Sequence, residues 1–115
     1  MKWTTDNVWK ECLAMWGYIE SVRVITTHIH SGQLKTTWVK LLHPRMELHH
    51  SCFFCEENER KGGITSPNEE GCCEFCPGRA VDPSFNCEEP GRSWNGEPIA
   101  FYYYLRKLNR KRKRS

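Results

Sequence analysis

Six of the seven cysteines lie between residues 52 and 87, and four of them form two Cys-x-x-Cys pairs. The first pair is Cys52 and Cys55, and the second pair, Cys73 and Cys76, follows after seventeen intervening residues. This spacing is typical of a metal site, because two residues between cysteines allow a tight turn to aim both sulfurs at one point. Four thiolates in a tetrahedral arrangement favour Zn²⁺. The sequence therefore predicts a structural zinc site with these four cysteines as ligands.

Other side chains near the two pairs are alternative ligands. Cys87 is the favoured substitute, Cys72 stands directly beside the second pair, and His49 and His50 precede the first. A set of disulfides is the other interpretation of these cysteines. The odd cysteine count and the absence of a secretory signal at the start of the sequence favour reduced thiols and metal.

The N-terminal third predicts a helix over residues 6–21, because apolar side chains recur at three- and four-residue steps. Cys12 belongs to this apolar face and is expected to be a buried core residue rather than a ligand. Residues 22–29 are rich in β-branched side chains and favour a strand. Residues 34–42 fit either a helix or a hairpin strand, with the helix slightly favoured.

Residues 47–96 are rich in Gly, Pro, Asn, Glu and Cys and carry no sustained apolar period. We expect an irregular module there, over residues 46–96, which zinc stabilises by on the order of 10 kcal/mol or more. The expected architecture is a small single domain of the α+β class over residues 1–105, followed by a basic tail over 106–115.

The last apolar segment predicts a C-terminal helix that begins at Pro98, where the missing N–H of proline costs nothing. Phe101, Tyr104, Leu105 and Leu108 share one face of this helix and are expected to pack inward. The helix then runs on into the basic tail.

The net charge of +3 averages three unlike segments. Residues 1–46 carry +3, residues 47–105 carry four basic and eleven acidic side chains, and residues 106–115 carry seven basic side chains and no acidic one. Such a basic run contacts phosphates or is simply a solvated helix end. The candidate nucleic-acid-binding residues are Arg106, Lys107, Arg110, Lys111, Arg112, Lys113 and Arg114.

Catalysis is the weakest of the functional interpretations. His43, His49 and His50 lie near a cysteine knuckle, as in metal-dependent nucleases of the His-Asn-His type. The chain has no histidine after residue 50, however, and no second histidine-bearing helix follows the knuckle. We therefore expect no enzymatic activity, and no small-molecule substrate is evident.

The pattern Ser-Cys-Phe-Phe-Cys-Glu at 51–56, Cys-Glu-Phe-Cys-Pro at 73–77 and the later Cys87 and Trp94 resembles small cysteine-rich hypothetical proteins of bacteriophages. Lys35-Thr36-Thr37-Trp38 is similar to an element that often precedes their first knuckle. The resemblance covers roughly residues 34–108. It implies an origin in a phage genome and work in the cytoplasm of an infected bacterium, and it implies no particular activity.

Two binding functions follow from the charges. The first is a non-catalytic accessory protein that binds a host protein of the defence or transcription machinery through its acidic module, and inhibits or redirects it. The second is a nucleic-acid-binding protein that uses the basic tail. The longest apolar run, Ile99–Leu105, is far too short to span a membrane.

Overall fold

The computed structural model describes residues 2–46, 53–63 and 73–114. Throughout these residues the regular structure is helical, with five α-helices and no strand. The helices are α1 (Thr5–Ile25), α2 (Ser31–Leu42), α3 (Phe53–Arg60), α4 (Pro77–Val81) and α5 (Pro98–Arg114). The expected α+β class is therefore wrong, and the described fold is all-α.

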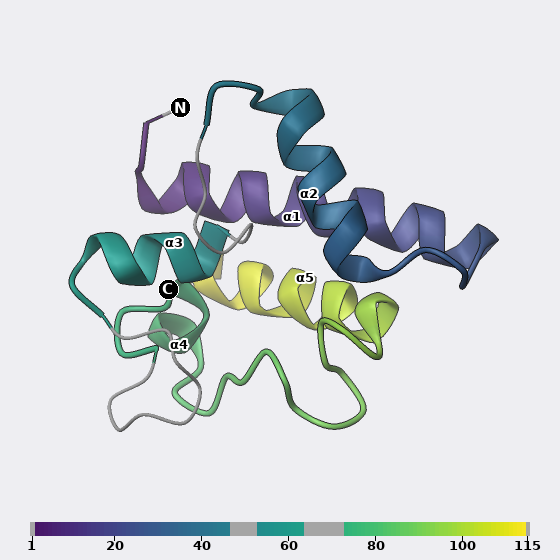
Figure 1. Ribbon diagram of the computed structural model, residues 1–115. Coiled ribbons are helices and arrows are strands. Elements are labelled where there is room, and N and C mark those ends of the chain that lie inside the picture. The colour runs from purple at the N-terminus through teal and green to yellow at the C-terminus, as the bar shows by residue number, and fades with distance from the viewer. Residues whose placement is uncertain (1, 47–52, 64–72, 115) are drawn as a thin grey trace.

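The longest helices, α1 and α5, lie side by side and run in opposite directions (Figure 1). α2 crosses α1, while the short helices α3 and α4 lie near the start of α1 and the end of α5. Both ends of the chain consequently lie at the same end of the α1–α5 pair.

α1 begins at Thr5, one residue before the predicted start, and Thr4 caps it, because its hydroxyl accepts a hydrogen bond from the Asn7 amide at 3.2 Å. The predicted strand over residues 22–29 is wrong, because α1 continues through its first four residues to Ile25. Val22 packs against the apolar core from the helix, whereas the Ile25 side chain is 86% exposed. The β-propensity of these residues is weak and depends on context, so the packing of Val22 as part of the helix overrides it.

Residues 34–42 belong to α2, which decides the helix–hairpin ambiguity in favour of the helix. The buried residues Leu34, Lys35, Trp38 and Val39 form pairs four residues apart, so they share one face. Leu42 follows Trp38 by four residues, but it is the last residue of α2 and is 58% exposed.

The core joins the inner faces of the helices. Trp16 of α1 lies edge-on to Phe101 of α5, with ring centroids 4.9 Å apart. Cys12 is buried in this core, as predicted. Gly17 allows a close approach of the two helices, because a Cβ there would lie 3.2 Å from the Tyr102 hydroxyl.

The segment expected to be irregular contains α3 and α4 and contributes its own apolar side chains to the core. Phe53 and Phe54 of α3 and Phe85 after α4 are all buried. Phe54 packs edge-on against Trp9 of α1 at 4.7 Å between ring centroids. The apolar period is invisible in the sequence because α3 is only eight residues long and otherwise polar.

α5 begins at Pro98 and buries Phe101, Leu105 and Leu108, as the sequence predicts. Tyr104 is half-buried at the edge of the same face. The helix continues to Arg114, so the basic residues 106–114 are part of α5.

Candidate functional site

The described cysteines of the predicted knuckle lie at element ends. Cys55 is in the first turn of α3, Cys76 is the N-cap of α4, and Cys87 lies in a turn before α5. The Cys76 amide donates to the Cys73 carbonyl at 3.1 Å, which closes a tight turn over residues 73–76. Cys73 adopts a positive φ of 62°, a conformation uncommon for a residue with a side chain.

Asn58 fastens this turn to α3. Its side chain is completely buried, and its Oδ1 accepts a hydrogen bond from the Phe75 amide at 2.7 Å. The Gly63 amide donates to the Asn58 carbonyl at 2.8 Å, and a Cβ on Gly63 would collide with the Asn58 side chain. The helix that carries Cys55 is thereby held against the second Cys-x-x-Cys turn.

Within residues 2–46, 53–63 and 73–114, no three His, Cys, Asp or Glu side chains form a group that could hold a metal ion. The predicted ligand Cys52 and the alternative ligands Cys72, His49 and His50 lie outside these residues. The four-cysteine zinc site thus remains a prediction. The predicted ligands Cys55, Cys73 and Cys76 are described, and these three do not form such a group with one another.

The only one of the three nuclease-type histidines that the structure describes is engaged elsewhere. His43, at the end of α2, shares a hydrogen bond with Glu11 of α1, with 2.8 Å between Nε2 and Oε2. The His43 ring also packs near Trp38 and Phe53. These contacts give His43 a structural part in joining α1, α2 and α3.

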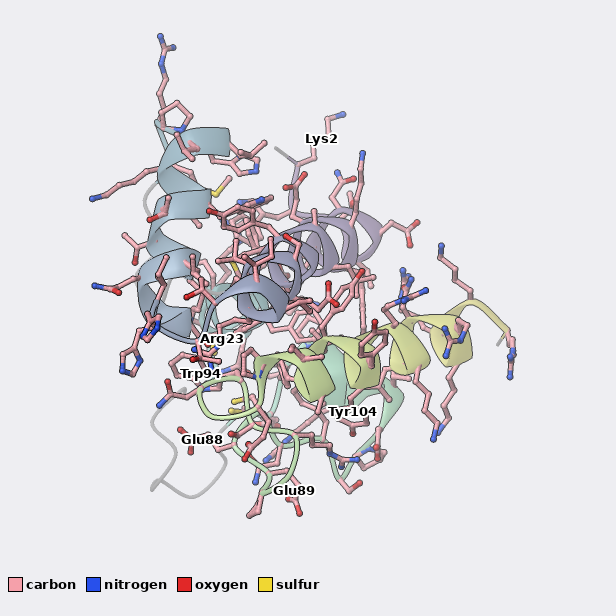
Figure 2. All side chains as sticks on the ribbon, turned by 90° about the vertical axis from the view of Figure 1, so that its right-hand side faces the viewer. Lys2, Arg23, Glu88, Glu89, Trp94 and Tyr104 are labelled. Atoms are coloured by element: carbon pink, nitrogen blue, oxygen red, sulfur yellow. The ribbon has the colours of Figure 1, made fainter. Side chains whose placement is uncertain are left out.

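Most of the predicted basic residues lie on one exposed face of α5. A stripe at three- and four-residue steps contains Tyr103, Arg106, Lys107, Arg110, Lys113 and Arg114, all exposed; we call it the α5 basic stripe. The Arg106 guanidinium lies 5.6 Å from the Tyr103 ring centroid. α5 itself carries no carboxylate. Nitrogen-tipped side chains project from the far end of this helix into solvent (Figure 2).

Arg112 differs from the rest of the predicted set because its guanidinium turns toward α1. It donates to Asp6 Oδ1 at 2.7 Å and lies 5.2 Å from the Trp9 ring centroid. Asn109 Oδ1 accepts a further hydrogen bond from Arg112 Nη2 at 2.9 Å. Arg112 therefore fastens the end of α5 to the start of α1, and the exposed phosphate-binding candidates are the other six.

The acidic segment offers less acidic surface than its sequence suggests. Glu56 and Glu57 are buried, at 8% and 6% exposure. Glu97, by contrast, is exposed, and hydrogen bonds from Ser93 lower the pKa of its carboxyl, which favours the charged form. An acidic surface that attracts a host protein remains a prediction.

Asp82, which follows α4, binds Tyr104 of α5. The Tyr104 hydroxyl donates to Asp82 Oδ2 at 2.8 Å, and the Ser84 hydroxyl donates to Oδ1 at 2.7 Å. The hydrogen bonds from Ser84 and Tyr104 lower the pKa of Asp82 to about 2. Burial, together with the Asp82 hydrogen bond, raises the pKa of Tyr104 to about 12. Tyr104 lies beside the loop that carries Glu88 and Glu89 (Figure 2), and Arg92 stacks on its ring at 3.7 Å.

Lys35 and Trp94, two residues of the phage-type pattern, are in direct contact. The Lys35 ammonium of α2 lies 4.0 Å from the Trp94 ring centroid and 6.0 Å from that of Trp16. Lys35 is 8% exposed, so this cation–π contact is largely desolvated. It holds the loop before α5 against α2.

Sequence reasoning does not single out three residues that shape the surface around the knuckle: Asn58, Phe75 and Trp9. Phe75 is exposed although it is an aromatic residue. Its position between Cys73 and Cys76 is the feature of the sequence that could have marked it as a functional residue. The hydrogen bond from Phe75 to Asn58 joins residues seventeen apart, and no short-range pattern marks it.

Comparison with models of known protein families, with curated proteins and with solved structures found no match for this chain. None of the helices in the described residues has both the length and the apolar character needed to cross a membrane. The functional assignment therefore rests on the chemistry of the surfaces described above.

Proposed function

We propose that this chain is a non-catalytic nucleic-acid-binding protein whose α5 basic stripe contacts the phosphate backbone. The observation that carries the proposal is the placement of Arg106, Lys107, Arg110, Lys113 and Arg114 on one exposed helix face that holds no carboxylate. Cations at successive helical turns neutralise neighbouring phosphates and release their counterions. The exposed ring of Tyr103 adds an aromatic contact at the same face.

The proposed binding is electrostatic and tolerant of sequence. Its affinity should fall steeply with salt, with a slope of about −0.7 in log K against log salt for each phosphate contacted on a single strand. Binding of a host protein through the acidic segment is the competing prediction. The burial of Glu56 and Glu57 removes two carboxylates from that surface, so the structure supports it less well.

The test compares two triple variants of equal charge by fluorescence anisotropy with a labelled single-stranded oligonucleotide. Arg106→Gln, Arg110→Gln and Lys113→Gln neutralise the stripe. The matched control neutralises three cations that are exposed elsewhere, Lys10, Lys40 and Arg45.

The stripe variant should bind at least about tenfold more weakly, and its salt slope should be less steep by about 2, because three phosphate contacts are lost. The control variant should retain most of its affinity. Equal losses in the two variants would show that only net charge matters and would refute a localised interface.

We also propose that Zn²⁺ held by Cys52, Cys55, Cys73 and Cys76 stabilises the region around α3 and α4. The support is the cysteine spacing, together with the Asn58 hydrogen bond that holds α3 against the second cysteine turn. A bound zinc supplies folding free energy here and no reaction chemistry. Reduced thiols of this kind fit a bacterial cytoplasm, the compartment we propose for the protein.

A further inference from the structure

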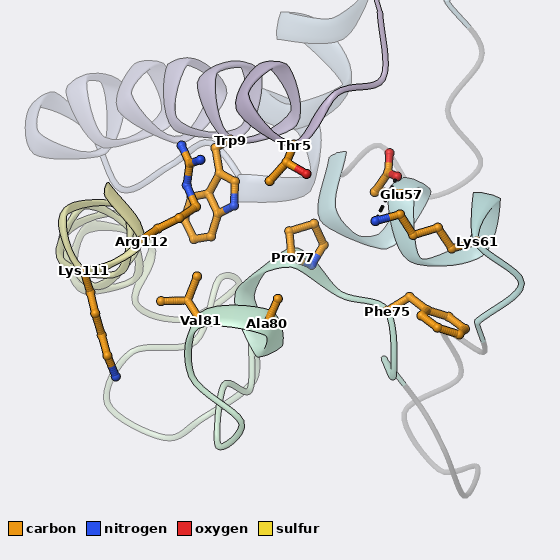
Figure 3. A pocket seen from close by; sticks show the side chains of 10 residues that line it. All are labelled: Thr5, Trp9, Glu57, Lys61, Phe75, Pro77, Ala80, Val81, Lys111 and Arg112. Carbon is orange, nitrogen blue, oxygen red and sulfur yellow. Dashed lines mark ion pairs between the residues drawn. The ribbon is translucent and has the colours of Figure 1, made fainter. Parts of the chain in front are cut away.

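A pocket of about 390 Å³ lies between the start of α1, the knuckle and the end of α5. Its walls include the apolar side chains of Trp9, Phe75 and Pro77 and the polar side chains of Thr5, Lys61 and Lys111 (Figure 3). This volume falls within the range of small-molecule sites, which are mostly apolar with a few placed polar groups. The pocket is therefore large enough for one heterocyclic base.

The indole N–H of Trp9 and the Oε2 atom of Glu57 are buried polar groups of the lining without a hydrogen-bond partner among the described residues, and Trp9 is the donor of the two. Trp9 is 1% exposed, and its Nε1 has no hydrogen-bond partner among the described residues. In Figure 3 this nitrogen turns toward Thr5 and Pro77, into the pocket. The ring is fixed by Phe54 on its edge and by the Arg112 guanidinium. A ligand acceptor in the pocket would satisfy this buried donor.

Phe75 supplies an aromatic face at the edge of the same pocket. Its side chain is 41% exposed, while its amide is held by Asn58 at 2.7 Å. An exposed ring on a fixed backbone is suited to stacking, which every base accepts because every base has a π face.

The charge around the pocket favours an anionic partner. Lys61 lies on one side, 3.6 Å from Glu57, the one acidic residue of the lining. Lys111 lies on the opposite side, one helical turn after Lys107 of the α5 basic stripe. The stripe thus continues to the rim of the pocket without an intervening carboxylate on α5.

We propose that this pocket binds a base of a single-stranded nucleic acid whose phosphates lie along the α5 basic stripe. The base stacks on Phe75, and one of its carbonyl oxygens or ring nitrogens accepts the Trp9 indole hydrogen bond. This inference rests on the proposed nucleic-acid binding and adds single-strand preference to it, because a base inside a duplex cannot enter a pocket.

The first test uses an oligothymidine and an abasic oligomer of the same length, which carries the same phosphates and no bases. Phe75→Leu keeps an apolar side chain and removes the π face, and Phe75→Tyr is the matched aromatic control. Phe75→Leu should weaken binding of oligothymidine by at least about fivefold and leave the abasic oligomer unchanged. Phe75→Tyr should retain binding of both.

Equal losses on the two oligomers, or no loss on oligothymidine, would overturn the base pocket. The stripe triple variant distinguishes the two proposals, because it should weaken binding of both oligomers. If it does so while Phe75→Leu weakens neither, only the pocket is refuted. If the stripe variant weakens neither oligomer, the proposed function is refuted as well.

The second test observes the pocket without a substitution in it. The chain has five tryptophans, and the Trp9 indole N–H signal is assigned in an NMR spectrum from a Trp9→Phe sample. Thymidine monophosphate should shift this signal, whereas ribose 5-phosphate should leave it in place. An unchanged signal with the nucleotide, or an equal shift with the sugar phosphate, would contradict insertion of the base beside Trp9.

Discussion

The α1–α5 pair and the segment from residue 73 to residue 97 are held together by different kinds of contact. α1 and α5 meet through buried apolar side chains, such as Trp16 against Phe101. The segment 73–97 buries fewer apolar side chains, among them Phe85, packs Trp94 partly buried against the core, and adds polar contacts such as the hydrogen bond from Tyr104 to Asp82.

The difference lies in how each region tolerates change. Apolar packing spreads its free energy over many contacts, and its strength depends on volume and shape. A polar clamp concentrates its effect in one donor and one acceptor, so one substitution leaves a buried group without a partner. Variants in each region therefore test whether it depends on the contacts assigned to it.

Cys55→Ser should have the largest effect, because it removes a proposed zinc ligand. The bound metal contributes on the order of 10 kcal/mol in such segments, so α3 and α4 should unfold while α1 stays partly helical. Native mass spectrometry should show one zinc in the unchanged protein and none in the variant. Cys12→Ala is the matched control, since Cys12 is buried in the core and should not affect metal content. Unchanged protein without zinc would contradict the proposal.

Trp16→Ala should lower the free energy of unfolding by about 3–5 kcal/mol, because it opens a cavity in the apolar half of the molecule. Trp16 is 1% exposed and contacts both Phe101 and Trp94. Val24→Ala, on the same helix but 64% exposed, should change stability by less than about 0.5 kcal/mol. Urea unfolding measures both. If the two variants lost similar amounts of unfolding free energy, the packing between α1 and α5 would not be the main source of stability in this region.

The α1–α5 pair is also the part of the fold that the sequence predicts well. The apolar period of α1, its start within one residue of the predicted position, and Pro98 as the start of α5 agree with the structure. These signals are local, and a long helix repeats its pattern over several turns. The predicted strand over residues 22–29 is wrong because Val22 packs, partly buried, against the core as part of α1, which is a tertiary effect that residue composition does not contain.

The functional surfaces are less predictable from the sequence. The basic residues of α5 are obvious as a run, but the contact of Arg112 with Asp6 joins residues 106 apart and has no local signature. Phe75 and Trp9 meet around one pocket only because α1, α4 and α5 converge there. Spacing therefore predicts the kinds of chemistry present, while the identity of each neighbour requires the fold.

Asn58→Ala should lower the free energy of unfolding by about 1–3 kcal/mol, because it removes a completely buried side chain that accepts a hydrogen bond from the Phe75 amide. Hydrogen exchange at the Phe75 amide should become markedly faster. A general loss of stability would instead accelerate exchange throughout the protein and not only in this turn. Asn86→Ala is the matched control, because Asn86 accepts a similar bond from the Glu88 amide at 3.0 Å at an exposed site. Its effect should be within about 0.5 kcal/mol. Equal effects would mean that burial of the Asn58 contact adds nothing.

Loss of the hydrogen bonds to Asp82 should have the smallest effect on the free energy of unfolding, and this effect should depend on pH. The pKa of Asp82 is lowered from 3.8 to about 2 in the folded chain, so its ionised form is favoured by folding. This stabilisation is fully present above about pH 4 and disappears as the pH falls to about 2. The difference in unfolding free energy between the unchanged protein and Asp82→Asn should therefore shrink over this interval. Because other carboxyls titrate in both proteins, only this difference reports on Asp82. A difference that stays constant from pH 5 to pH 2 would show that the Ser84 and Tyr104 hydrogen bonds do not depend on the charge of the carboxylate.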